Sequence, residues 1–342
     1  MIKNFNTITK RIVPVAQNAP LYYSLNLDGA AGWILLWIDV CLRGQIVLSA
    51  GTTSGTAVGE NPGGLISNIQ FDLAAQPGGL YRGGKVKNLT PRSILRGNVF
   101  DRGRFQDDLG GSNTIAGTAA TTPLKLRLPL YFALPNIIKG VETGLRLDQF
   151  TQALLTINMS SVAAMRTGND RTVDLTGAYF EIIEHRAYAP GYYPVGTLFE
   201  SDNYLPIQGA NSRFVIDQQL SKTETYLDAL LMGETTNRTL ADTILNRATM
   251  FSGIEQFSDL FAEEVRMQNN DWITEVASTL LTGLYWFDFL QDPQTFSRPL
   301  SNALGFLNMV LDVSNPGTDD LLLRTRRLAP RLGNPPTARK AA

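Results

Sequence analysis

The sequence holds 342 residues, of which 44% are hydrophobic and 18% are charged. This composition is typical of a folded globular protein, and the length favours two domains of ordinary size over one. The 30 Lys and Arg residues and the 31 Asp and Glu residues leave a formal net charge of -1. The chain as a whole therefore has no positive field that would recruit nucleic acid, and we expect no specific nucleic-acid binding.

Cysteine and histidine are almost absent, which excludes several classes of site. The only cysteine, Cys41, permits no intrachain disulfide and no cysteine-based metal cluster, and the only histidine, His185, leaves little scope for zinc or triad chemistry. We therefore expect no metal and no cofactor. The chain does not open with a secretory signal, so we expect it to fold in a reducing cytosol and interpret the sequons at Asn88, Asn158 and Asn237 as chance matches.

The first 20 residues are polar, basic and interrupted by proline, with no lasting period. Lys3, Lys10 and Arg11 all precede the first acidic residue, Asp28. This pattern predicts an N-terminal arm rather than part of a domain. A short strand, Leu21 to Leu27, is expected to follow it.

The segment Gly32 to Ser49 alternates apolar residues with a mixed set, and from Ile34 to Leu48 every even position except Gly44 is aliphatic. This pattern predicts a long strand that buries one face and needs a second sheet to cover it. At about 3.3 Å per residue such a strand would be roughly 50 Å long, so we expect a bend near Gly44. The segment is not a membrane span, because its apolar run ends at Asp39 after about ten residues and a span needs roughly twenty.

The rest of the first half contains further alternating segments separated by long, Gly-rich connections. Pro129 places its strand at a sheet edge or at a bulge. A short strand or helix near Ser93 to Phe100 is expected within a long loop. The predicted strands are Leu65 to Leu73, Leu124 to Leu134, Ala153 to Met159 and Ala178 to Tyr188, and the predicted loops are Gly51 to Gly64 and Leu80 to Thr122.

The second half begins after a seam at Pro190 to Pro194. The Ser252-x-x-Glu255 spacing of a capping box, followed by apolar residues at helical spacing, predicts a helix that begins at Ser252. Tyr226 to Met232 fits a strand or a helix. The predicted strands are Arg213 to Asp217, Leu280 to Phe289 and Phe306 to Val313, and a basic tail with Arg324, Arg326, Arg327 and Arg331 is expected after them.

Strands with one buried face and no internal repeat predict an all-β protein of two consecutive antiparallel sandwiches, and jelly rolls protect the edges of such sheets. The expected organisation is an arm at 1–20, a first domain at 21–190, a second domain at 195–318 and a tail at 319–342.

Candidate catalytic features are weak. Gly79 to Val86 has the spacing of a phosphate loop but lacks the Ser or Thr that holds magnesium, and no helix follows it. His185 and Cys41 lie in strands, where packing or hydrogen bonding explains them. Three carboxylate pairs, Asp107–Asp108, Glu263–Glu264 and Asp319–Asp320, are adjacent in sequence, and adjacent side chains point apart. Tyr285, Trp286 and Phe287 fit core packing on one face and a contact on the other better than a sugar site.

The order and spacing of several segments resemble the double jelly-roll major capsid proteins of tailless icosahedral viruses with an internal membrane, the tectivirus-like lineage that includes bacteriophages and the adenovirus hexons. The segments that carry the resemblance are PGGLISNIQFDL, LKLRLPLYFALP, LLTINMS, AYFEIIEHRAY leading into PGYYP, SGIEQFSDLFAEEVRMQ, TGLYWFDF and LGFLNMVLDVS.

The resemblance implies two eight-stranded jelly rolls and pseudo-hexameric homotrimers that tile an icosahedral shell over an internal lipid membrane. It implies a virion location, no enzymatic site, and contacts with neighbouring trimers and with penton or minor capsid proteins. The basic ends would lie at the capsid base as membrane or assembly contacts, through Lys3, Lys10, Arg11, Arg324, Arg326, Arg327 and Arg331.

Two other functions fit the same strand pattern. Jelly rolls also host glycan sites, so the chain could be a glycan- or receptor-binding protein of the spike or lectin kind. A glycan-cleaving β-sandwich is the enzyme alternative, and it requires paired carboxylates about 5 to 10 Å apart in a cleft.

Overall fold

The structure is a computed structural model of the whole chain. It describes residues 4–16, 18–48, 54–57, 63–102, 121–134, 143–161, 166–169, 173–206, 211–218, 224–234, 240–252, 255–272, 282–289, 300–301, 307–314 and 320–333. Two compact units account for the chain. The first combines Met1–Leu95, Gln106–Phe199 and Pro330–Ala342, and the second combines Arg96–Phe105 with Glu200–Ala329.

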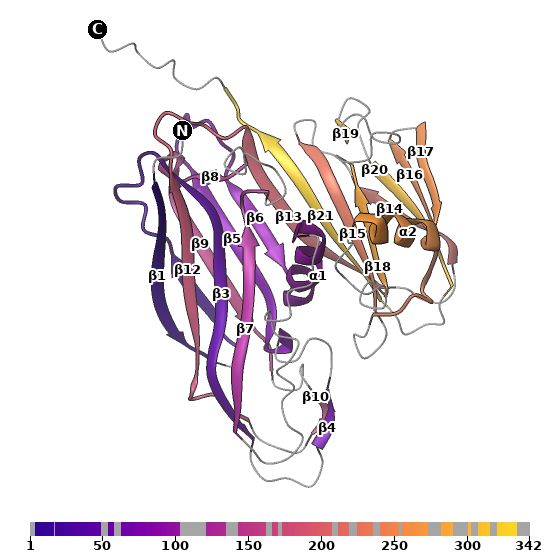
Figure 1. Cartoon of the computed structure of the whole chain (residues 1–342), viewed down its shortest axis with the longest axis horizontal. Helices are drawn as coiled ribbons and strands as arrows, with labels where there is room; N and C mark the ends of the chain where they lie inside the picture. The colour runs from indigo at the N-terminus through magenta and orange to yellow at the C-terminus, as the bar shows by residue number, and fades with distance from the viewer. Residues whose placement is uncertain are drawn as a thin grey trace. The chain divides into compact units, whose positions relative to one another are not determined.

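The first unit is a sandwich of two antiparallel sheets, one of which forms the layer labelled β1, β12, β3 and β7 in Figure 1. In spatial order that sheet contains β1 (Asn4–Pro14), β12 (Ala178–Tyr188), β3 (Trp33–Leu48) and β7 (Thr121–Tyr131). The facing sheet contains β2 (Pro20–Ser24), β9 (Phe150–Met159), β5 (Ile66–Ala75) and β6 (Gly84–Leu89). Shorter elements are β8 (Leu145–Arg146) and β11 (Val173–Asp174) beside β3, the pair β4 (Ser54–Ala57) and β10 (Arg166–Asn169), and the 3₁₀ turns Gly63–Leu65 and Leu147–Gln149.

The second unit has the same plan. One sheet contains β13 (Gly196–Pro206), β21 (Asp320–Pro330), β15 (Thr225–Glu234) and β18 (Leu284–Asp288), with β19 (Leu300–Ser301) beside β15. The other contains β14 (Asn211–Gln218), β20 (Leu307–Val313), β16 (Leu245–Ser252) and β17 (Glu255–Phe261). The α-helices in the described part of the chain are α1 (Pro91–Arg102) and α2 (Ala262–Trp272).

The strand order identifies both units as jelly rolls. When the principal strands of each unit are ranked along its chain from 1 to 8, one sheet has the order 1-8-3-6 and the other the order 2-7-4-5, in both units. Two sheets of this Greek-key connectivity define an eight-stranded jelly roll. The prediction of an all-β double jelly roll is confirmed.

The long strand β3 organises the first jelly roll, as its alternation predicted. Ile38 and Val40 are fully buried on its inner face, and β3 pairs with β12 along one side and β7 along the other. At Gly44, near which we expected a bend, the backbone has a φ of 92° where the pairing with β12 begins. A Cβ at Gly44 would lie 1.9 Å from the carbonyl oxygen of Gly177, so only glycine fits there.

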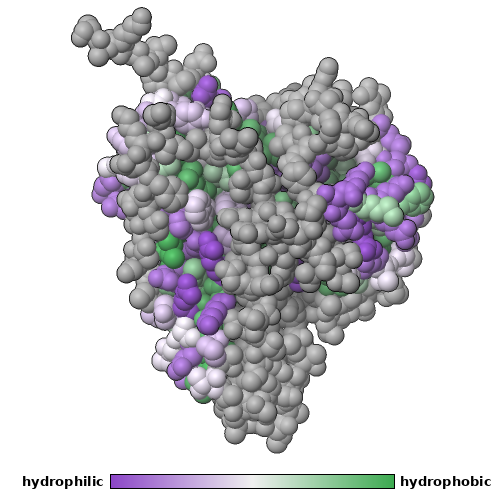
Figure 2. Space-filling model, viewed as in Figure 1, coloured by the Kyte–Doolittle hydropathy of each residue, from purple (hydrophilic) through white to green (hydrophobic). Residues whose placement is uncertain are grey.

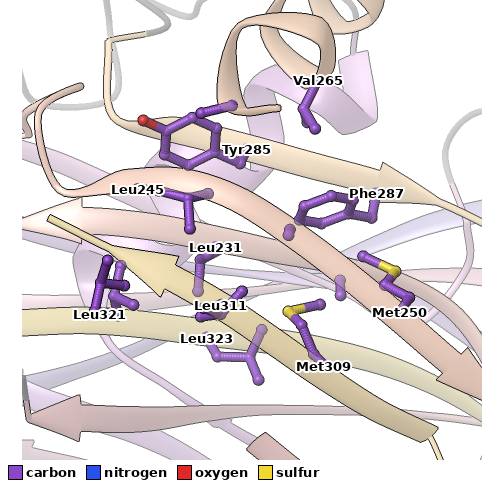
Figure 3. Packing of buried hydrophobic residues seen from close by; sticks show 14 of the residues in the cluster. Leu231, Leu245, Met250, Val265, Tyr285, Phe287, Met309, Leu311, Leu321 and Leu323 are labelled. Carbon is purple, nitrogen blue, oxygen red and sulfur yellow. The ribbon is translucent and has the colours of Figure 1, made fainter. Parts of the chain in front are cut away.

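The core of the second jelly roll lies between its two sheets and α2 (Figure 3). Tyr285 and Phe287 point into this core, together with Val265 of the helix, whereas Trp286 between them faces the opposite side of β18. Tyr226 to Met232, which fitted either a strand or a helix, is the strand β15 and contributes Leu231 to the same core.

Three expectations about local structure are wrong. The N-terminal arm includes β1, which pairs with β12 through a bulge between Thr9 and Ile12 that interrupts the side-chain alternation. The predicted tail begins with the strand β21, which was not predicted because its Arg residues suggested a solvated segment.

The predicted helix begins at Ala262 and not at Ser252, because Ser252 and Glu255 pair across the β16–β17 hairpin. The carboxylate of Glu264 instead accepts the N–H of Phe261 at 2.8 Å and caps α2.

Two other local predictions hold. The short element expected near Ser93 to Phe100 is the helix α1, and the Thr90 hydroxyl caps it by accepting the N–H of Ser93 at 3.2 Å. Among the strands that the structure describes, β7 pairs with β3 alone, which agrees with the edge position inferred from Pro129.

Leu128→Asp tests the inner face of β7. Leu128 is fully buried opposite Val40, so an aspartate there would be an unpaired charge in the core. We expect a loss of at least about 3 kcal/mol in the free energy of unfolding, measured by urea denaturation. The exposed Thr121→Asp on the same strand is the control and should change stability by less than about 0.5 kcal/mol. Equal stability of the two variants would contradict the assigned strand face.

Candidate functional site

The outer face of the β1–β12–β3–β7 sheet carries a charged cluster centred on Asp39. The Asp39 side chain is 4% exposed, and one of its oxygens, Oδ2, lies 2.9 Å from an Arg127 guanidinium nitrogen and 3.0 Å from His185 Nε2. The His185 ring stacks on Trp37 at a centroid separation of 4.1 Å. The single histidine is therefore held by an aromatic face and a carboxylate within one sheet, as the packing interpretation predicted.

Cys41 lies on the same face and is buried. Burial, reinforced by the negative charge of Asp39, raises the pKa of its thiol to about 11. The thiolate is the reactive form of cysteine, so Cys41 is a packed thiol and not a nucleophile near neutral pH.

A second charged cluster lies on the outer face of the β13–β21–β15–β18 sheet. Glu200 Oε1 is 3.3 Å from guanidinium nitrogens of both Arg324 and Arg326, and Arg326 is also 3.2 Å from Asp228. All four side chains are at most 10% exposed. Gly97, Val99 and Phe100 of α1 lie against this face. At Gly97 a Cβ would lie 1.5 Å from the Arg324 guanidinium, so glycine permits the close approach of α1.

The predicted seam at Pro190 to Pro194 is fixed by side chains of the first unit. Arg146 donates to the carbonyl of Tyr192 and stacks over the ring of Tyr193 at 3.9 Å, while Tyr81 donates to the carbonyl of Pro194 at 2.8 Å. Arg146 also pairs with Asp148 at 2.8 Å. Burial opposes ionisation of Asp148, but hydrogen bonds from Arg146 and Gly32 outweigh it and hold the pKa of that carboxyl below its usual range.

The basic residues predicted to be membrane or assembly contacts lie in different environments. Arg324 and Arg326 are buried in β21, so they cannot reach a membrane surface in this fold. Arg327 pairs with Glu224 at 2.9 Å, and Arg331 donates to the carbonyl of Tyr193 at 3.3 Å. Lys10 and Arg11 lie in β1, and Lys3 lies outside the described residues.

Sequence reasoning missed the Glu200 cluster because basic residues near a chain end resemble a solvated tail. One signal was present, since Arg324 and Arg326 are two residues apart and share a face of any strand. Their acidic partners come from β13 and β15, and their position could not be read from spacing within β21.

The catalytic candidates find no supporting geometry. Gly84 to Val86 belong to β6, so the Gly79 to Val86 segment is not the strand-to-helix loop that cradles a phosphate. Glu263 and Glu264 are exposed on α2, while Asp107, Asp108 and Asp319 lie outside the described residues. Within the described ranges no cluster of three His, Cys, Asp or Glu side chains could hold a metal. The crevice between Gly97, Phe100 and Trp286 is too narrow for a water-sized sphere.

No helix among the described residues is long and apolar enough to cross a bilayer.

Comparison with known proteins identifies the fold. No protein-family model and no curated protein matches the sequence. The solved major capsid protein of Sulfolobus Turreted Icosahedral Virus is similar, with a TM-score of 0.69 and 12% identity over 96% of this chain and 98% of that chain. The major capsid protein P2 of bacteriophage PM2 gives a TM-score of 0.60 and 10% identity, over 97% and 99% of the two chains. The capsid model of the virus PBCV-1 gives a TM-score of 0.57 and 10% identity, over 96% of this chain and 95% of that chain. The chain therefore shares its whole double jelly-roll fold with these proteins.

Glu200→Gln tests the charged cluster in the second jelly roll. The change removes the carboxylate that Arg324 and Arg326 share and leaves two guanidinium groups in a buried environment. We expect the free energy of unfolding to fall by about 3 to 5 kcal/mol in urea denaturation. Glu263→Gln on the exposed face of α2 is the matched control and should be nearly neutral. A neutral result at Glu200 would mean that the cluster does not constrain the fold.

Proposed function

We propose that this chain is the major capsid protein of an icosahedral virus. The observation that carries the proposal is the match of both jelly rolls, in chain order, to capsid proteins of comparable length, with 98% of the Sulfolobus virus protein covered. A receptor-binding spike or an enzyme built on one jelly roll would not require a second one of the same strand order. The three capsid structures give no support to the glycan-binding alternative.

In this proposal the chain acts by association with identical copies and catalyses no reaction. Homotrimers would present six jelly rolls as a pseudo-hexameric tile, and the tiles would form the shell of the virion with penton or minor capsid proteins. The ion pairs Arg43–Glu181 and Arg127–Asp39 on the outer face of the β3 sheet support this role, because charges that are paired within the chain can pack against a neighbour without a partner from it.

We further propose that the N-terminal basic residues Lys3, Lys10 and Arg11 contact an internal membrane or the adjacent tile. The burial and pairing of Arg324, Arg326, Arg327 and Arg331 leave these three as the remaining candidates from the predicted basic ends. Each exposed basic residue contributes on the order of 1 kcal/mol at an anionic bilayer, and assembly of many copies multiplies the effect.

The test of assembly is native mass measurement of the purified chain, followed by electron microscopy. We expect a trimer that forms hexagonal tiles or closed shells at higher concentration. A glycan-array measurement on the same sample should show no binding. A strictly monomeric chain with a defined sugar ligand would overturn the capsid proposal.

The test of the membrane contact uses vesicles with and without anionic lipid. Lys3→Glu/Lys10→Glu/Arg11→Glu should leave the trimer intact and reduce co-sedimentation with anionic vesicles at least about tenfold, since three charge reversals remove several kcal/mol of attraction. Asn4→Ser/Asn6→Ser, at neutral positions of the same segment, is the control. Unchanged vesicle binding by the triple variant would assign the contact to other residues.

A further inference from the structure

The first jelly roll is not built from one continuous stretch of chain. Its unit combines Met1–Leu95, Gln106–Phe199 and Pro330–Ala342, so the segment Glu200–Ala329 of the second unit lies in sequence before its last part. That last part begins at the final residue of β21, the eighth principal strand of the second jelly roll. A short segment that follows the second jelly roll in sequence therefore belongs to the first.

Residues 331–333 of this last part form a strap on the first jelly roll. The backbone N–H of Arg331 donates to the carbonyl of Val195 at 3.0 Å. The backbone N–H of Leu332 donates to the carbonyl of Leu80 at 2.7 Å. Both acceptors belong to the first unit. The strap thus joins the connection between β5 and β6 to the linker that leads from β12 into β13.

The connection between β5 and β6 is anchored in the first jelly roll beside the strap. Tyr81, the neighbour of Leu80, is 2% exposed, and its ring lies 6.3 Å from that of Phe150 in β9. The Tyr81 hydroxyl donates to the carbonyl of Pro194 in the linker at 2.8 Å. The strap therefore reinforces a junction that a buried side chain already marks.

The linker accepts hydrogen bonds at three consecutive carbonyls, those of residues 193–195. The carbonyl of Tyr193 accepts from the Arg331 guanidinium at 3.3 Å, and that of Val195 accepts from the Arg331 backbone. Tyr81 supplies the bond between them. Two of these three donors belong to Arg331, so the grip on the linker depends largely on the strap.

The strap is held by its backbone and by one guanidinium, and not by side-chain burial. Leu332 is 59% exposed, and Gly333 has no side chain. Among the described residues that Figure 2 shows, hydrophobic side chains form only small areas separated by hydrophilic ones. A free peptide bound in this way gains little, because its hydrogen bonds replace bonds to water and its ordering costs conformational entropy.

The strand β21 lowers this entropic cost. Within the second jelly roll β21 pairs with β15 along its length, from Asp320 opposite Glu234 to Leu328 opposite Thr225. The strap follows β21 without a connecting segment. An ordered β21 therefore limits the positions that the strap can take and raises its effective concentration at its acceptors.

We propose that the strap is a closing device that couples the two jelly rolls. It locks the linker to the connection between β5 and β6, and it does so only when β21 is ordered in the second jelly roll. The first jelly roll is therefore closed last, after a strand that lies far beyond it in the sequence has formed. The coupling concerns folding within one chain and does not depend on the capsid function.

Limited proteolysis with trypsin tests the closure through cleavage after Arg82, two residues beyond Leu80. Leu332→Pro removes the N–H that Leu80 accepts and should accelerate this cleavage about tenfold or more, because cleavage follows the population of the locally open form. Cleavage after Arg266 in α2 reports on the second jelly roll and should not change.

The matched control is Leu332→Ala, which keeps the N–H and alters a side chain that is largely exposed. This variant should be cleaved after Arg82 at the rate of the unmodified chain. Equal rates for Leu332→Pro and Leu332→Ala would show that the strap does not close the first jelly roll, and the proposal would be wrong.

A double-mutant cycle tests the coupling. Leu323 of β21 is 2% exposed in the core of the second jelly roll, so Leu323→Ala loosens β21 there. It should accelerate cleavage after Arg82 in the unmodified chain at least about threefold and should add little in the Leu332→Pro background, where the strap is already released. Unchanged cleavage after Arg82 in Leu323→Ala would refute the coupling. Because neither experiment measures assembly, both outcomes are independent of whether the chain forms a capsid.

Discussion

The fold depends on one constraint, the burial of the inner faces of two facing sheets in each jelly roll. Side chains alternate across a strand, so filling the inner face with aliphatic and aromatic residues forces the intervening residues outward. β18 shows both consequences, with Tyr285 and Phe287 in the core and Trp286 outside it. On central strands the outer face is also shielded by its neighbours, and a charged residue placed there needs a partner. Asp39 of β3 meets this need with Arg127, and Arg326 of β21 meets it with Glu200 and Asp228.

These ion pairs specify the arrangement of strands more than they stabilise it. A buried ion pair gains little net free energy, because the loss of hydration offsets the attraction between the charges. Its geometry, however, joins different strands. Asp39 of β3 contacts Arg127 of β7 and His185 of β12, and Arg326 of β21 contacts Glu200 of β13 and Asp228 of β15. A slip of one residue in any of these strands would move a charge into the core, so each cluster selects one register.

The sequence predicted the parts of the fold in which burial on one face leaves a clear alternation. β3, β7, β9 and β12 were found in this way, and their order and spacing carried the resemblance to double jelly-roll capsid proteins. β1 and β21 were missed for two different reasons. A bulge breaks the alternation of β1, whereas the arginines of β21 have partners on distant strands that local spacing does not reveal. The helix start at Ala262 was misplaced because the Ser-x-x-Glu spacing also fits a hairpin in which Ser252 faces Glu255.

The repetition of one strand order in both units does not make the two jelly rolls interchangeable. In the first, the outer face of the β3 sheet keeps the partly accessible ion pairs Arg43–Glu181 and Arg127–Asp39, whereas in the second Val99 and Phe100 pack against the equivalent sheet. The helices differ in the same sense, because α1 is buried and α2 exposes an acidic face.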